Sequence, residues 1–129
     1  MAIRSVKEMV KEAKGEITSL SVEEARAKHD SGDILLVDIR DVRELKREGK
    51  VPGAMHAPRG MLEFWVDPAS PYHNEKFATD KQVVLFCASA WRSALAAKTL
   101  KDMGMVNIAE MEGGFGAWRE AGAPIDKDD

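Results

Sequence analysis

One cysteine and one arginine are the residues of this chain best suited to covalent chemistry. Cys87 is the only cysteine; it follows the apolar run 82–86 and precedes a helix-forming run that opens at Arg92. At the carboxyl end of a strand, beside a helix N-terminus, loop N–H groups and the helix dipole favour a thiolate. Arg92 adds a permanent cation. We therefore predict a nucleophile, Cys87, in an anion-binding loop; the alternative is a small buried cysteine that only ends a strand. The residues expected to form that loop are Ala88, Ser89, Ala90, Trp91, Arg92 and Ser93.

The composition is that of an ordinary globular protein. Hydrophobic residues make up 44% and charged residues 32%, with a formal net charge of −3, which argues against disorder. The sequence has no cluster of lysine or arginine residues, which argues against nucleic-acid binding. A single cysteine forms no internal disulfide, and the first residues lack an apolar core for a secretion signal or membrane span, so a cytoplasmic protein is expected. The histidines show no metal-ligand spacing, and neither a metal nor a cofactor is expected.

Hydrophobic periodicity predicts alternating helices and strands. Residues 1–15 are expected to form an amphipathic helix that ends at Gly15 and either packs on the body or joins two subunits. The expected strands lie at 17–20, 34–38, 54–57, 82–86 and 106–111. Helices are expected at 21–29, 41–48, around 61–65, from Arg92 to Gly104, and at 115–121. This alternation predicts an α/β fold: an open, five-stranded, mainly parallel sheet with helices on both faces.

The strand that precedes Cys87 places this residue where open parallel sheets bind ligands, beyond the carboxyl ends of their strands. A long irregular connection, residues 66–81, comes before that strand. Such connections are often functional, although many are insertions. His73 in this connection has the chemistry of an acid or base, but a solvated loop histidine is the more usual case.

Four separated segments match one known pattern: Val37–Arg40 with Glu44 downstream, Gly49–Ala54, the loop CASAWRS, and Glu112–Trp118. Together they resemble a rhodanese-type domain over residues 16–125. Outside it lie the helix at 1–15 and a charged tail, 126–129, that we expect to fray.

The resemblance implies a sulfurtransferase. Cys87 would take a sulfane sulfur from a small donor anion such as thiosulfate, become a persulfide, and pass the sulfur to a thiol or to cyanide. Because the chain has one cysteine, the acceptor must come from outside it. No nucleic acid or membrane is implied, and a homodimer is compatible with the pattern.

Two other functions stay open. Phosphatases and arsenate reductases of similar fold carry one more residue between cysteine and arginine, usually with histidine before the cysteine. Here Phe86 precedes Cys87 and Arg92 comes early, which favours sulfur transfer. The second alternative is a weakly active rhodanese-like module that binds a partner, or senses sulfane sulfur or oxidants, through Cys87.

The loop departs from the family pattern at two positions. The family often has glycine at Ala90 and a cation near Ala88. If the backbone at Ala90 needs a positive φ, alanine costs roughly 1 kcal/mol there. We expect this residue to weaken the loop.

Residues outside the loop complete the expected site. Asp38 and Arg40 match an acidic and basic pair after the second strand, and a structural salt bridge is their expected role. Trp91 is expected at the mouth of the site. Met61, Phe64 and Trp65 would either form an apolar rim with Trp91 or pack in the ordinary way. Arg59 would either add a cation at the rim or be a solvated surface arginine.

Overall fold

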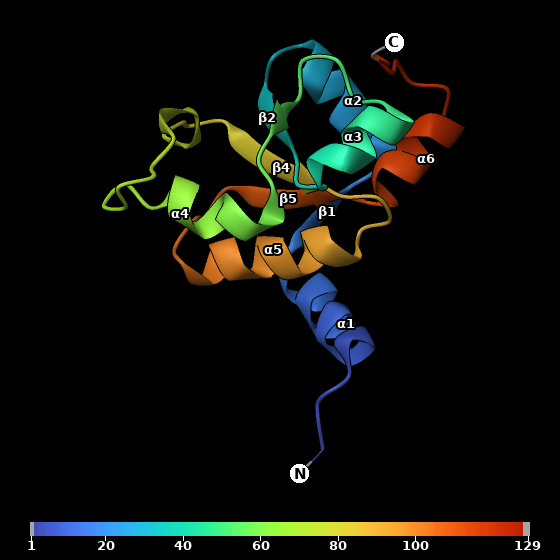
Figure 1. The fold of residues 1–129 in the computed structure, drawn as a ribbon. Helices are drawn as coiled ribbons and strands as arrows, with labels where there is room; N and C mark the ends of the chain where they lie inside the picture. Colours follow the sequence, from blue (N-terminus) through green and yellow to red (C-terminus); the bar gives the residue numbers. More distant parts are fainter. Residues whose placement is uncertain (1, 128–129) are drawn as a thin grey trace.

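The computed structural model describes residues 2–127 and shows a sheet of five parallel strands flanked by helices (Figure 1). The strand order is β1-β5-β4-β2-β3. Every neighbouring pair is parallel, so all carboxyl ends meet at one edge of the sheet. The predicted α/β architecture is confirmed, and the sheet is wholly parallel. The strands are β1 (Thr18–Leu20), β2 (Ile34–Asp38), β3 (Met55–His56), β4 (Gln82–Phe86) and β5 (Ile108–Met111).

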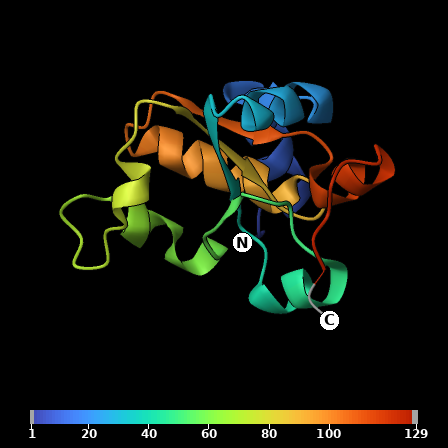
Figure 2. The ribbon, with the colours of Figure 1, turned by 90° about the horizontal axis from the view of Figure 1, so that it is seen from above.

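Helices cover both faces of this sheet (Figure 2). On one face α2 and α6 enclose a core that includes Phe86, Phe115 and Trp118. On the other face α4 and α5 enclose a core that includes Leu85 and Cys87. The N-terminal helix α1 packs on α5, on the outside of this second layer (Figure 1). The helices are α1 (Val6–Glu16), α2 (Val22–Asp30), α3 (Val42–Glu48), α4 (Leu62–Val66), α5 (Trp91–Asp102) and α6 (Gly114–Glu120), with short 3-10 turns at Arg59–Met61 and Glu75–Phe77.

Side-chain caps set several helix starts. Ser21 and Glu24 form the capping box of α2, and Asp41 and Glu44 form that of α3. Differences from the sequence prediction are small. Helix α1 continues through the expected stop at Gly15 to Glu16, because a helix can carry a glycine near its end at a modest cost.

The chain ends show a further difference. Asp126, where fraying was expected to begin, exchanges backbone hydrogen bonds of 2.8 and 2.9 Å with Lys50. The ordered chain therefore reaches beyond residue 125, and the rest of the expected tail, residues 128–129, lies outside the described residues. Within the described part, no helix combines the length and apolar character needed to cross a membrane.

The long connection 66–81 is attached to the body. Phe77 is buried in the core beside α5, and the Asn74 N–H donates to the Trp65 carbonyl at 2.9 Å. His73 Nδ1 donates to the same carbonyl at 2.9 Å. His73 therefore anchors its own loop, which gives it a structural role here.

Glu110 is a carboxyl group buried in the sheet. It lies on β5 between Ser19 of β1 and Leu85 of β4, with no exposed surface. Neither carboxyl oxygen has a hydrogen-bond partner in the described structure. Burial raises the pKa of Glu110 to about 7; Lys14 opposes this rise and Glu112 adds to it.

We expect Glu110→Gln to change the pH dependence of stability. Below pH 4.5 the carboxyl is protonated in both the folded and unfolded states and has no effect. As the pH rises from 4.5 to about 7, the unfolded state releases the proton first, so wild-type stability falls. The glutamine variant lacks this loss and should gain about 3 kcal/mol on the wild type across that window.

Urea unfolding from pH 4 to pH 8 measures this difference. The exposed Glu120→Gln is the matched control. A constant difference between wild type and Glu110→Gln would contradict the prediction.

Candidate active site

Cys87 lies at the carboxyl end of β4, as the sequence predicts. The β4 backbone pairs with β2 up to Phe86, whose carbonyl accepts from the Ile39 N–H at 2.9 Å. Four residues after Cys87, helix α5 begins at Trp91. The cysteine is only 1% exposed, so a ligand can reach its sulfur only through the loop that follows.

The loop wraps its amide groups around the sulfur. The Ala90 N–H donates to Cys87 Sγ at 3.2 Å, and the Ser93 N–H donates at 3.4 Å. The Ser93 hydroxyl lies 3.6 Å from the same atom. Donors that converge on one point from a loop and a helix start make an anion-binding site. Such a site suits a thiolate, or an anionic sulfur attached to it.

Helix α6 binds backbone carbonyl groups of this loop. The Phe115 N–H donates to the Cys87 carbonyl at 2.7 Å, and the Gly116 N–H donates to the Ala88 carbonyl at 3.1 Å. Gly114 has φ +58°, and a Cβ there would lie 2.3 Å from the Cys87 carbonyl oxygen. Glycine at this position therefore lets α6 approach closely enough to bind the loop carbonyls.

Ala90 adopts the strained conformation considered from the sequence. Its φ is +80°, and among the described residues it is the only non-glycine with positive φ. The methyl group is fully buried. The Ala90 N–H still reaches the sulfur, so the strain leaves the loop geometry in place.

We expect Ala90→Gly to change stability by less than about 1 kcal/mol. Relief of the left-handed strain, roughly 1–2 kcal/mol, is offset by the lost burial of one methyl group, about 0.8 kcal/mol, and by the backbone entropy of glycine, about 0.5–1 kcal/mol. Ala88→Gly, in the same loop but without positive φ, should instead destabilise by about 0.5–1 kcal/mol. Urea unfolding compares the two variants, and equal shifts would refute the account of strain.

Arg92 is held by an acidic partner on another helix. Its Nη1 and Nη2 donate to the two carboxylate oxygens of Glu44 at 2.7 and 3.0 Å. This hydrogen bonding lowers the pKa of Glu44 and raises the pKa of Arg92, which the nearby Cys87 also raises. Arg92 remains 42% exposed. The arginine therefore stands beside the loop in a bidentate ion pair and is accessible to an incoming anion.

The expected pair of Asp38 and Arg40 is a buried salt bridge. Arg40 Nη2 donates to Asp38 Oδ2 at 2.8 Å and to the Gly49 carbonyl at 2.9 Å, and both charged side chains are almost fully buried. The guanidinium lies 4.0 Å from the ring centroid of Phe115. Because the Phe115 N–H binds the Cys87 carbonyl, this pair supports the loop from behind.

Comparison with known proteins agrees with this geometry. The model of the rhodanese-like domain matches residues 21–121. The chain belongs to the rhodanese-like family. A sulfurtransferase from Allochromatium vinosum is 33% identical over 110 residues, which cover 85% of this chain and 92% of that protein. The chain is therefore related to single-domain sulfurtransferases.

Two solved structures carry the same rhodanese fold. A Rhodopseudomonas palustris protein of unknown function, described as a possible tyrosine phosphatase, is 52% identical with a TM-score of 0.93, covering 98% of this chain and 97% of that one. The polysulfide-sulfur transferase homodimer of Wolinella succinogenes is 38% identical with a TM-score of 0.75, covering 95% of this chain and 88% of that one.

Three of the expected rim residues make contacts of their own. Arg59 pairs with Glu63 at 2.6 Å, and Phe64 packs edge to face on Tyr72, with ring centroids 6.4 Å apart. Trp65, in α4, packs against the core. A role for these residues at the mouth of the site stays a prediction. The side chains that share a groove with Trp91 come from α1.

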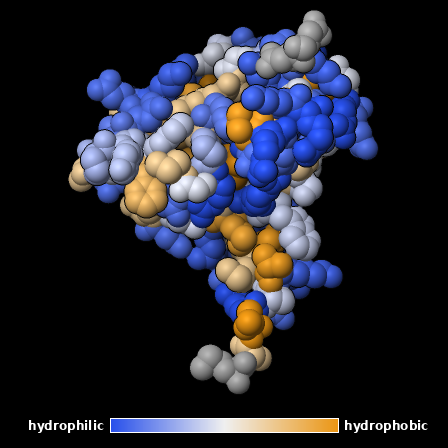
Figure 3. Space-filling model, in the orientation of Figure 1, coloured by the Kyte–Doolittle hydropathy of each residue, from blue (hydrophilic) through white to orange (hydrophobic). Residues whose placement is uncertain are grey.

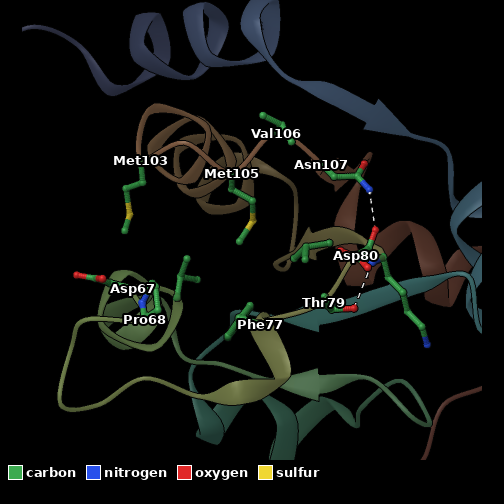
Figure 4. A pocket seen from close by; sticks show the side chains of 12 residues that line it. Asp67, Pro68, Phe77, Thr79, Asp80, Met103, Met105, Val106 and Asn107 are labelled. Atoms are coloured by element: carbon green, nitrogen blue, oxygen red, sulfur yellow. Dashed lines mark hydrogen bonds between the residues drawn. The ribbon is translucent and has the colours of Figure 1, made fainter.

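A cavity of about 830 Å³ lies away from Cys87, at the amino ends of β4 and β5 (Figure 4). Phe77, Met103 and Met105 line it, together with Lys81 and Asn107. Cys87 lies at the opposite, carboxyl edge of the sheet, so this cavity is separate from the Cys87 loop. Among residues 2–127, no group of three or more His, Cys, Asp or Glu side chains gathers to hold a metal ion.

Glu44 is the site residue whose role the sequence reasoning missed. It was noted only as part of the family pattern, although its position three residues after Asp41 completes a capping box. That local pattern places Glu44 at the start of α3. Its contact with Arg92 depends on the tertiary fold.

Proposed function

We propose that this protein is a sulfurtransferase that carries sulfane sulfur as a persulfide on Cys87. The observation that supports this most is the convergence of the Ala90 and Ser93 N–H groups on Sγ. These donors stabilise a thiolate before the reaction and a terminal sulfur anion after it. Family membership and the sulfurtransferase of Allochromatium vinosum point to the same chemistry.

The first step is a displacement at sulfur. The Cys87 thiolate attacks the outer sulfur of a donor such as thiosulfate and forms a new S–S bond. The S–S bond of the donor breaks, and its electron pair leaves with sulfite. The Ala90 and Ser93 N–H groups favour the thiolate that this attack requires. Arg92 is in place to attract the doubly charged donor, which is then held by the loop amides.

The second step needs an external acceptor. Cys87 is the only cysteine, so the persulfide cannot be resolved by an internal disulfide. A thiolate or cyanide attacks the outer sulfur, and Cys87 departs as a thiolate. A single reduced cysteine is suited to the cytoplasm, where we place the reaction.

A homodimer is part of this proposal. The Wolinella succinogenes relative is described as a homodimer. In this chain Ile3 just before α1 and Val6 and Met9 on α1 are exposed, and Figure 3 shows hydrophobic side chains along this projecting part of the chain. Pairing of two chains would remove this apolar surface from water.

Intact mass spectrometry after brief exposure to thiosulfate tests the proposed function. We expect a gain of one sulfur atom that cyanide removes as thiocyanate. No gain with thiosulfate or with polysulfide would overturn the persulfide mechanism. Hydrolysis of p-nitrophenyl phosphate under the same conditions would instead support the phosphatase alternative, which the short spacing from Cys87 to Arg92 disfavours.

A further inference from the structure

Helix α1 and the Cys87 loop together form a groove. Six residues line its volume of about 540 Å³: Lys7, Glu8, Val10, Lys11, Lys14 and Trp91. We call it the α1 groove. Trp91 connects it to the active site, because this residue belongs to the Cys87 loop and begins α5. Trp91 is 46% exposed while Cys87 is buried, so Trp91 is the large side chain of the loop that a visiting molecule meets.

The lysines of α1 lie mainly on the side of the helix that faces the groove. Lys7, Lys11 and Lys14 repeat at helical spacing and all three line the groove. None of these lysines forms an ion pair within residues 2–127. The acids Glu12 and Glu16 are engaged elsewhere, by Arg4 and Lys98 respectively. With Glu8 as the one acid in its lining, the groove is positive on a chain whose net charge is −3.

The length of this positive surface indicates the size of the molecule that it binds. From Lys7 to Lys14 the helix rises by about 10 Å, which is longer than a small sulfur donor. A polypeptide segment with several carboxylates matches this length and sign. The Trp91 ring, 46% exposed, provides apolar surface beside the lysines, and an exposed tryptophan is a frequent anchor in protein interfaces.

We propose that the α1 groove docks an acidic segment of the protein that accepts sulfur from Cys87. The inference rests on the proposed function for the transfer itself. The thiolate of the docked protein attacks the outer sulfur of the Cys87 persulfide; that S–S bond breaks, Cys87 leaves as a thiolate, and the acceptor carries the new persulfide. Docking at Trp91 brings the acceptor to the exposed side of the loop.

Binding is measured without any sulfur transfer. The full chain, labelled with ¹⁵N, is titrated with a glutamate-rich peptide that contains one leucine and no cysteine, and with its glutamine twin. We expect the glutamate peptide to bind about tenfold more tightly at low salt. The shifted signals should be the α1 amides and the Trp91 indole, and added salt should weaken binding. Equal affinity for both peptides, or shifts confined to other surfaces, would overturn the proposal.

Charge reversal locates the site. Lys7→Glu with Lys11→Glu should remove the preference for the acidic peptide, and Lys7→Gln with Lys11→Gln should reduce it without placing new acids on α1. The matched control, Lys76→Glu with Lys81→Glu, makes the same change in net charge at exposed positions before β4 and should retain the preference. An equal loss in the control would overturn the groove as the site. The proposal would also be overturned if two chains dimerise through the groove and the dimer dissociates when Lys7 and Lys11 are reversed.

Transfer rates separate this inference from the proposed function. Sulfur-loaded protein is mixed with a cysteine-containing form of the glutamate peptide, or with cyanide. Reversal of Lys7 and Lys11 should slow discharge to the peptide about tenfold and leave discharge to cyanide unchanged. If cyanide discharges the protein but the wild type and the charge-reversed variant discharge to the peptide at the same rate, the groove proposal fails and the proposed function stands. If no sulfur is loaded, the proposed function fails, and the titration still decides whether the groove binds an acidic segment.

Discussion

Cys87→Ser is expected to abolish sulfur uptake, with a loss of more than about 10³-fold in rate. A serine hydroxyl is not ionised at neutral pH and forms no persulfide. The change replaces one small side chain by another in a buried loop whose Ala90 and Ser93 N–H groups already donate hydrogen bonds to this position. We therefore expect the folded structure to persist. Intact mass after thiosulfate and the unfolding curve measure both properties.

A second variant tests whether the loop matters or only the thiol. In Cys87→Ser with Ala69→Cys, a thiol returns at an exposed position of the connection 66–81, far along the chain from the Cys87 loop. This protein should not recover uptake that cyanide reverses, because its thiol lacks converging amide donors. Recovery would show that an unassisted thiol suffices. Uptake by Cys87→Ser itself would exclude Cys87 as the carrier, and a binding module would then be the better reading.

Asp38→Asn is expected to lower the free energy of unfolding by about 3–5 kcal/mol. Arg40 is fully buried, and among residues 2–127 Asp38 is the only carboxylate within ion-pair distance of it. Its Nη1 already has no hydrogen-bond partner among the described residues. Asparagine keeps the shape of aspartate but leaves the cation uncompensated in the core. Urea unfolding at neutral pH measures the loss.

The chain offers a matched control for this substitution. Asp41 and Arg43 form an ion pair with the same spacing along the sequence, but Arg43 is 82% exposed. Asp41→Asn also keeps a good helix-capping residue at the start of α3. We expect only a small change in stability there. Similar losses in both variants would mean that burial of the Asp38–Arg40 pair does not set its importance.

The position of the active site follows from local patterns in the sequence. The apolar run before Cys87 and the helix after it place the sulfur at the carboxyl edge of a parallel sheet. The strand and the helix depend on neighbours within a few positions, which periodicity and turn chemistry report. The positive φ at Ala90 is suggested instead by the resemblance to the rhodanese family, which often has glycine at this position.

Other features depend on contacts that no local pattern carries. Glu44 and Arg92 are 48 residues apart and meet only when α3 packs near α5. Glu110 lies in a short buried strand, and nothing in the local sequence indicates that its carboxyl group lacks a hydrogen-bond partner. The groove that Trp91 shares with α1 is another such feature, because α1 and the Cys87 loop are far apart in the sequence and meet only when α1 packs on α5.

Glu44 serves two structures with one carboxylate. Its Oε1 accepts from the Asp41 N–H at 3.1 Å, which closes the first turn of α3, and from Arg92 Nη1 at 2.7 Å. An anion that draws Arg92 away from Glu44 exchanges one ion pair for another, so its affinity includes the free energy of the pair it breaks. By thermodynamic reciprocity, occupancy of the anion site and order in the first turn of α3 are linked. Substitutions at the start of α3 are thus expected to change how tightly the Cys87 loop binds the sulfur donor. Cys87 lies more than forty residues further along the chain.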